Sequence, residues 1–185
     1  MNPSTTHADA VRDAGLTGAI ANAVDRVDSD WSSAHMPAAH HVRRLARLFH
    51  KRAGEGLCTK PFHRFPQECR DRLLAASGLD GDEWPVLACR FSDQRWTLLT
   101  TKRLLWQKHT HRAALPLDAI LLATLHHGEI ARRHPELTVA LTRLRIVTTQ
   151  GHLYTIELEA GPSCFGFQHL MRKTTRMRPD ASASP

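Results

Sequence analysis

The chain has 185 residues, of which 42% are hydrophobic and 23% charged, a composition typical of one globular domain or a small domain with a helical extension. No run of about 18 apolar residues occurs, so no membrane-spanning helix is predicted. The net charge is +7 with neutral histidines, which favours anionic partners such as nucleic acid, anionic lipid or an acidic protein.

The positive charge is not concentrated in either half of the sequence. Residues 1–79 hold 11 Lys and Arg against 8 Asp and Glu, and residues 80–185 hold 14 against 10. This even distribution favours a solvated basic surface over a dedicated nucleic-acid face.

The first 79 residues are predicted to be mostly helical. Amphipathic stripes predict helices over residues 8–33 and 38–53. A third helix is expected to begin near Pro66 and to end at Gly78, because proline suits the first turn and glycine the position after the last. The sequence leaves open whether this segment is a separate domain or packs on the residues that follow.

The second of these helices is basic as well as amphipathic. Its apolar stripe consists of Val42, Leu45, Leu48 and Phe49, and its other face of Arg43, Arg44, Arg47, Lys51 and Arg52. Such a helix can lie on an anionic membrane or bury its stripe in its own protein. Because helix stability usually comes from tertiary burial, packing in the core is favoured.

From residue 83 onward the pattern changes from helical to β. Short apolar or alternating runs separated by turn residues predict seven strands, over residues 86–91, 95–100, 104–108, 112–115, 119–126, 137–149 and 152–159. A slip in the alternation near Thr142 predicts a β-bulge or bend in the sixth run. A last amphipathic helix is predicted over residues 161–176, and the small polar tail over 177–185 is expected to be disordered.

This pattern predicts an α+β fold in two parts. Residues 1–79 form a helical N-terminal segment, and residues 83–176 form a seven-stranded bent β-barrel or sandwich. Seven strands close imperfectly, and the apolar face of the last helix, with Phe167, Leu170 and Met171, can fill the opening.

The order of several short motifs resembles a known family. The run over residues 96–106, WTLLTTKRLLW, resembles the L-T-x-x-R-L hairpin of bacterial pleckstrin-homology-like (PH-like) and GRAM-type domains. Residues 115–120, LPLDAI, resemble their I-P-L-x-x-I segment, and residues 151–170 their last strand and capping helix. The resemblance covers about half of the chain, and it implies a scaffold that binds phospholipid head groups, peptides or partner proteins.

The first hairpin departs from the lipid-binding members of that family. They carry a basic Lys-x-Lys/Arg-x-Arg pattern there, whereas this chain places Asp93 between Arg90 and Arg95. Specific recognition of phosphoinositides is therefore not expected from the resemblance, and similarity of fold does not identify the ligand.

Basic residues near hairpin tips are the candidate ligand- or partner-binding residues. They are Lys102, Arg103, Lys108, His109, His111 and Arg112. Neighbouring loop tips can present such cations to an anionic ligand, although hairpin tips also carry charge as protection against aggregation.

No motif predicts catalysis, a cofactor or a metal site. The sequence has no G-x-S-x-G, no Cys–His signature and no phosphate-cradling glycine loop. Zinc needs about four convergent ligands, and Cys58, His63 and Cys69 supply three at loose spacing. Glu157 and Glu159 share one face of a predicted strand and are interpreted as solvated. We therefore expect no enzymatic activity, no cofactor and no metal.

The start of the sequence lacks the basic patch and apolar core of a secretory signal, so we expect a cytoplasmic location and no disulfides. The leading hypothesis is a bacterial, non-catalytic module that binds a protein partner as an adaptor or immunity protein. The alternative is peripheral binding to anionic membrane lipid through the basic loop tips, with strong salt dependence. Nucleic-acid binding is the least favoured alternative, because no recognition helix and no aromatic stacking platform is evident.

Overall fold

The computed structural model describes residues 36–125 and 140–176. In chain order its elements are helix α2 (Met36–Arg52), strand β1 (Thr59–Pro61), 3-10 helix η2 (Phe62–Arg64), helix α3 (Gln67–Ser77), strands β2 (Pro85–Ser92), β3 (Arg95–Thr100), β4 (Arg103–Lys108) and β5 (His111–Pro116), 3-10 helix η3 (Leu117–Ala119), strands β6 (Ile120–Leu125), β7 (Leu141–Thr148) and β8 (Leu153–Glu159), and helix α4 (Pro162–Arg176). The predicted helix over residues 8–33 and the predicted disordered tail lie outside the described residues.

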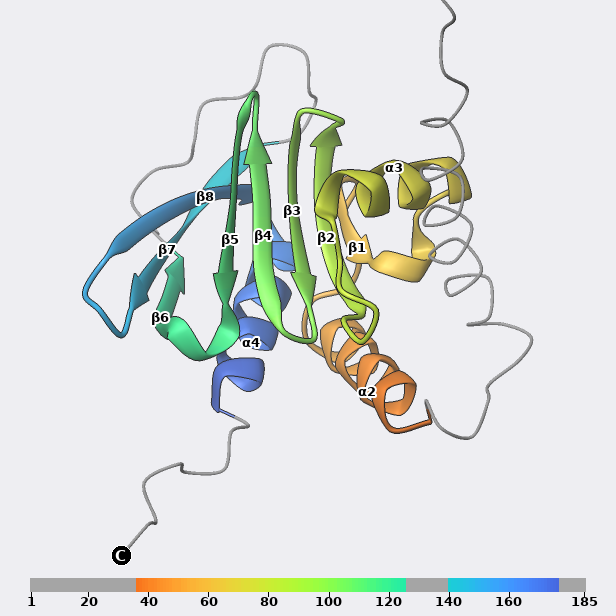
Figure 1. The fold of residues 1–185 in the computed structure, drawn as a ribbon, viewed down its shortest axis with the longest axis horizontal. Helices are drawn as coiled ribbons and strands as arrows, with labels where there is room; N and C mark the ends of the chain where they lie inside the picture. The colour runs from red at the N-terminus through yellow and green to blue at the C-terminus, as the bar shows by residue number, and fades with distance from the viewer. Residues whose placement is uncertain (1–35, 126–139, 177–185) are drawn as a thin grey trace, which may run out of the picture.

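The strands form two antiparallel sheets (Figure 1). Five strands pair in the order β1-β2-β3-β4-β5, and three in the order β6-β7-β8. The expected α+β class is therefore confirmed. The expectation of a seven-stranded barrel is not, because the described part of the chain contains eight strands and the two sheets do not close into a barrel.

The strand without a counterpart in the sequence prediction is β1, which lies in a stretch expected to be a loop. It has three residues, too few for an alternating pattern to be visible. Thr59 pairs with Cys89 and Pro61 with Leu87 of β2. Proline is tolerated in β1 because this strand forms the edge of the sheet.

The predicted bulge near Thr142 is wrong, since β7 and β8 pair in unbroken register. The slip in alternation has a different cause. Leu141 and Leu144 point to opposite faces of the sheet, yet both are buried. The face of Leu141 is covered at this end of the sheet, where its cross-strand neighbour Glu159 is buried as well.

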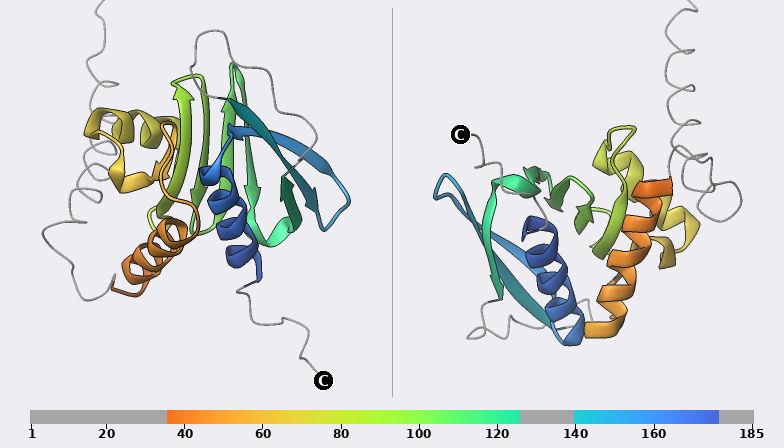
Figure 2. Two further views of the ribbon diagram at one scale, coloured as in Figure 1. Left: turned by 180° about the vertical axis from the view of Figure 1, so that it is seen from behind. Right: turned by 90° about the horizontal axis from the view of Figure 1, so that it is seen from below.

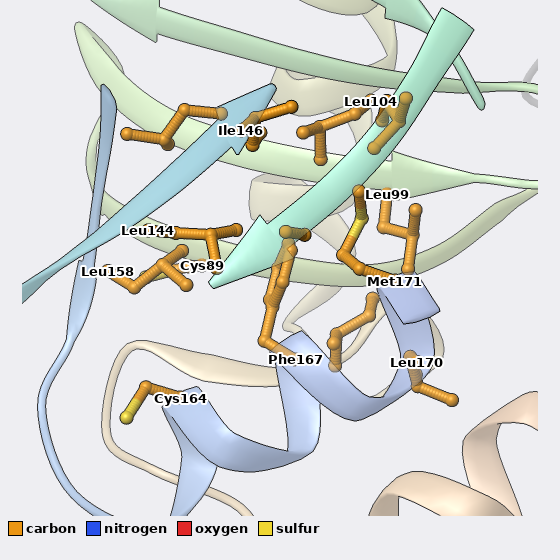
Figure 3. Close-up of a cluster of buried hydrophobic side chains, with 14 of the residues drawn as sticks. Cys89, Leu99, Leu104, Leu144, Ile146, Leu158, Cys164, Phe167, Leu170 and Met171 are labelled. Carbon is orange, nitrogen blue, oxygen red and sulfur yellow. The ribbon is translucent and has the colours of Figure 1, made fainter. Parts of the chain in front are cut away.

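The main core lies between the two sheets and α4, where side chains from all three meet (Figure 3). Phe167, Leu170 and Met171 of α4 are fully buried in it, as the apolar face of this helix predicted. Cys89 and Leu99 contribute from the five-stranded sheet. The last helix thus supplies the third layer of the core.

The opposite face of the five-stranded sheet is also covered. Trp96 and Leu98 of β3 project to that side and pack with Phe62 of η2 and Leu73 of α3. The region between α2 and β2 therefore packs on the outer face of the five-stranded sheet and covers it.

Helix α2 packs on α4 and on β2 (Figure 2). Leu45 and Phe49 are fully buried and belong to the same core as the residues of α4, which confirms that the apolar stripe of α2 is a core face. The two helices approach closely at Gly166, where an added Cβ would lie 2.5 Å from the Cβ of Ala53 and 2.8 Å from the ring of Phe49. Glycine is therefore required at this crossing.

Candidate functional site

The candidate site is a pocket of ≈ 370 Å³ between the five-stranded sheet and strand β8. Its lining includes Phe91, Arg95, Trp106, Lys108, Arg143 and Glu157. Phe91 lies two residues after the core residue Cys89 on β2, and Trp106 two residues after the core residue Leu104 on β4. Both pack against the core. The pocket is thus the continuation of the core towards the β2–β3 and β4–β5 turns.

A charge network crosses the pocket from one sheet to the other. Glu157 of β8 accepts hydrogen bonds from Arg95 of β3 at 2.5 Å and from Lys108 of β4 at 3.2 Å. Burial by itself raises the pKa of Glu157, but the charge of Arg95 and the hydrogen bonds from Lys108 and Arg95 lower it below its ordinary value. Two cations thus share one carboxylate, which favours an additional anionic group at this place.

Aromatic rings form the apolar part of the pocket. Trp106 meets Tyr154 edge to face, with ring centroids 5.6 Å apart. The guanidinium of Arg95 lies over the ring of Phe91, 5.2 Å from its centroid. The Nε atom of Arg95 is buried and has no hydrogen-bond partner within the described residues.

The polar groups of the pocket include hydroxyls as well as charges. Its described lining carries the hydroxyl groups of Thr97 and Thr155, and Thr97 pairs with Cys89 of β2. The arrangement can hold a ligand by charge, hydrogen bonds and aromatic contact.

The six basic residues predicted from the sequence do not gather in one place. Lys102 and Arg103 lie at the start of β4, and Lys108 at its end, followed by His109, His111 and Arg112. A strand of six residues spans about 17 Å, so the two groups lie at opposite ends of the sheet. Lys108 lines the pocket described above, whereas Lys102 and Arg103 line a second pocket of ≈ 510 Å³ beside α2, η3 and α4.

Most of these cations are occupied by partners from the chain itself. Lys102 pairs with Asp82 at 2.5 Å, and Arg112 donates to the carbonyl oxygen of Ser77. Arg103 pairs at 2.5 Å with the carboxylate of Glu83, which is fully buried. These contacts hold these loop-tip cations against the segment from the end of α3 to β2.

The two histidines of the set lie at the β4–β5 turn. His109 has φ 55, a left-handed conformation, and its backbone amide donates to the carbonyl oxygen of Gln94 at 2.7 Å. His111 is exposed at the start of β5. Neither histidine lines either of the two pockets.

The sequence interpretation of Glu159 as a solvated side chain on the outer face of β8 is wrong. Its side chain is 4% exposed and accepts hydrogen bonds from the backbone amides of Leu57, Cys58 and Thr59 at 2.8, 3.0 and 2.7 Å. The loop before β1 covers this end of β8. Gly56 allows this close approach, because an added Cβ there would lie 2.2 Å from Oε2 of Glu159.

Within residues 36–125 and 140–176, no group of three His, Cys, Asp or Glu side chains can hold a metal ion, so Cys58, His63 and Cys69 do not form a site. The four cysteines are free. None of the described helices combines the length and the apolar character needed to cross a membrane. No family model, curated protein or solved structure matches this chain.

Proposed function

We propose that this chain is a non-catalytic binding module with a PH-like architecture, and that the pocket between β2–β4 and β8 receives a segment of a protein partner. The order of elements supports the PH-like assignment. Strands β2–β5 form consecutive antiparallel neighbours, β6–β8 form a second sheet, and α4 follows with its apolar face in the core.

The lining of the pocket is the observation that carries the proposal. Protein-binding pockets combine aromatic surface with a few placed polar groups, and here Phe91 and Trp106 adjoin the Arg95–Glu157–Lys108 network. Arg95 and Lys108 share the single carboxylate of Glu157, which suits an acidic side chain or a terminal carboxylate on the partner. The loop-tip cations give less support to lipid binding, because Lys102, Arg103 and Lys108 each pair with an internal acid.

The experiment fills the pocket without changing its charge. Thr155 is exposed and lines the pocket, whereas Thr124 is exposed in the same cross-strand row but lies on β6, away from it. Thr155→Trp is the test variant and Thr124→Trp the matched control. Each tagged protein is used for affinity purification from the native organism at low and moderate salt, with mass spectrometry of the co-purifying proteins and lipids.

We expect one stoichiometric protein to survive moderate salt with the wild type and with Thr124→Trp, and to be lost with Thr155→Trp. Recovery of the same protein with all three baits would place the partner elsewhere on the surface and overturn the pocket assignment. Enrichment of anionic lipid that disappears with salt, without a protein, would replace the proposal by membrane binding.

A further inference from the structure

The first and last described helices carry basic side chains and no acidic ones. Neither α2 nor α4 contains Asp or Glu. Their exposed cations, here called the basic face, are Arg43, Arg44, Arg47, Lys51 and Arg52 of α2 and Arg172 and Lys173 of α4.

The basic face accounts for the whole net charge of the protein. The chain holds 25 Lys and Arg against 18 Asp and Glu. Seven of these cations belong to the basic face, which leaves 18 cations against the 18 acids elsewhere. The excess is therefore a local property of two helices. Counting the charge by halves of the sequence conceals it, because α2 and α4 lie in different halves.

The two helices meet at one end and diverge towards the other (Figure 2). They are in contact where Gly166 meets Ala53 and Phe49. His169 of α4 lies between them: burial, then the charges of Arg52, Lys173 and Arg172, lower its pKa. Cations of both helices thus act on one side chain.

No internal acid neutralises most of this surface. Among the described residues, no ion pair includes Arg44, Arg47, Lys51, Arg52, Arg172 or Lys173. The nearest acid in sequence, Glu55, pairs with His50 and Arg64 instead. This contrasts with Lys102, Arg103 and Lys108 at the loop tips, which have acidic partners.

Arg44 and Arg47, in the middle of α2, are placed against the stability of the helix. Arg44 lies three residues before Arg47 and Lys51 four after it, and like charges at these spacings destabilise a helix. The helix dipole favours cations only in the last turn, which holds Lys51 and Arg52. An external polyanion would remove the repulsion.

The burial of the apolar stripe distinguishes between polyanions. A helix that lies in a membrane interface needs outward apolar side chains, but Leu45 and Phe49 are fully enclosed in the core. What α2 presents is predominantly arginine, whose planar guanidinium binds phosphate oxygens in a bidentate manner. Phosphates repeated along a chain match cations repeated along two helices.

We propose that the basic face of α2 and α4 binds the phosphate backbone of nucleic acid without sequence preference. The residues of this face do not line the pocket between β2–β4 and β8, so the inference goes beyond the protein-binding function and stands or falls independently. Backbone binding of this kind needs neither a recognition helix in a groove nor an aromatic platform.

The test is fluorescence anisotropy of a labelled 20-base-pair DNA duplex of random sequence, titrated with the full chain at 50–200 mM salt. We expect a dissociation constant of about 1–100 μM at physiological salt. The logarithm of the association constant should fall against the logarithm of salt concentration with a slope of about −4 to −6, since each neutralised phosphate contributes about −0.9.

A matched pair of variants separates position from net charge. Arg43→Glu/Arg44→Glu/Arg47→Glu reverses three cations of the basic face. Arg64→Glu/Arg72→Glu/Arg145→Glu reverses three exposed arginines elsewhere and changes the net charge equally. At 50 mM salt we expect the first variant to lose affinity about tenfold or more, and the second about threefold or less. Thermal unfolding establishes that both variants are folded.

Three outcomes would overturn the inference. The first is no binding of the duplex by the folded wild type, and the second is an equal loss of affinity in both triple variants. The third is binding to vesicles of phosphatidylglycerol and phosphatidylcholine, or displacement by polyglutamate, without measurable affinity for the duplex. In that last case the surface serves a membrane or an acidic protein.

Discussion

At the scale of single residues, the carboxylate of Glu159 shows how one side chain positions a loop. It accepts hydrogen bonds from three consecutive amides, and consecutive amides of this kind form a concave anion site. Here the anion is supplied by the chain itself. The loop between α2 and β1 is thereby fixed to the end of β8.

We predict that Gly56→Ala and Glu159→Ala each lower the free energy of unfolding by about 2–4 kcal/mol. The first forces a methyl group against the carboxylate, and the second leaves three buried amides without an acceptor. The double variant should lose less free energy of unfolding than the sum of the two single losses, because removing the carboxylate makes room for the methyl group.

Urea unfolding of the four proteins measures this coupling. Gly81→Ala is the control, since nothing lies within 4 Å of its added Cβ, and its free energy of unfolding should match that of the wild type. Strict additivity of the two losses would show that Gly56 and Glu159 do not act through their mutual contact.

At the scale of elements, α2 combines a core face with a charged face that weakens the helix. Arg47 has Arg43 four residues before it, Arg44 three before it and Lys51 four after it. Each like-charge pair of this spacing destabilises a helix by about 0.2–0.5 kcal/mol. Such an arrangement is typical of a surface retained for binding at the expense of stability.

We therefore predict that Arg47→Gln raises the free energy of unfolding by about 0.5–1 kcal/mol at low ionic strength. The gain should disappear near 1 M salt, where the screening length falls to about 3 Å. Thermal unfolding at both salt concentrations measures it, with Arg145→Gln on the outer face of β7 as the control. A gain independent of salt would point to helix propensity instead of repulsion.

The elements themselves were largely predictable from local patterns. Periodicity and turn residues located α2, α3, α4 and strands β2–β8 to within a few residues. Most of these elements have one buried face, whereas β2 and β3 are buried on both faces and appear as short apolar runs between turns. β1 was missed because its three residues are held by pairing with β2 and by Glu159, neither of which leaves a periodic trace. The misplaced bulge reflects burial on both faces at Leu141, which breaks alternation without breaking register.

At the scale of the whole molecule, the candidate site was much less predictable than the fold. The pocket joins Phe91 and Trp106 to Glu157, which lies on a different sheet, so no local spacing indicates that they meet. The six predicted basic residues are near in sequence, but β4 carries them to opposite ends of the sheet, so they do not form one cluster.

The shared core predicts that the β-sheets do not fold alone. A fragment of residues 80–185 would lose Leu45 and Phe49 from the core and would expose Trp96 and Leu98 on the outer face. We expect this fragment to lack a cooperative urea transition and to bind a hydrophobic dye, whereas the full chain unfolds cooperatively. A sharp transition in the fragment would show that residues 36–79 are dispensable for the fold.

The contact between Glu159 and the loop before β1 joins residues 100 to 102 positions apart, and α2 meets α4 over a similar separation. Closing so long a loop loses chain entropy before any packing compensates for it. Proteins dominated by such distant contacts fold over about milliseconds to seconds. During translation the strands emerge before α4 exists to cover them. The newly made chain therefore passes through an interval in which its sheet edges and apolar faces are exposed to other molecules. We expect chaperone binding to matter most for this protein in that interval.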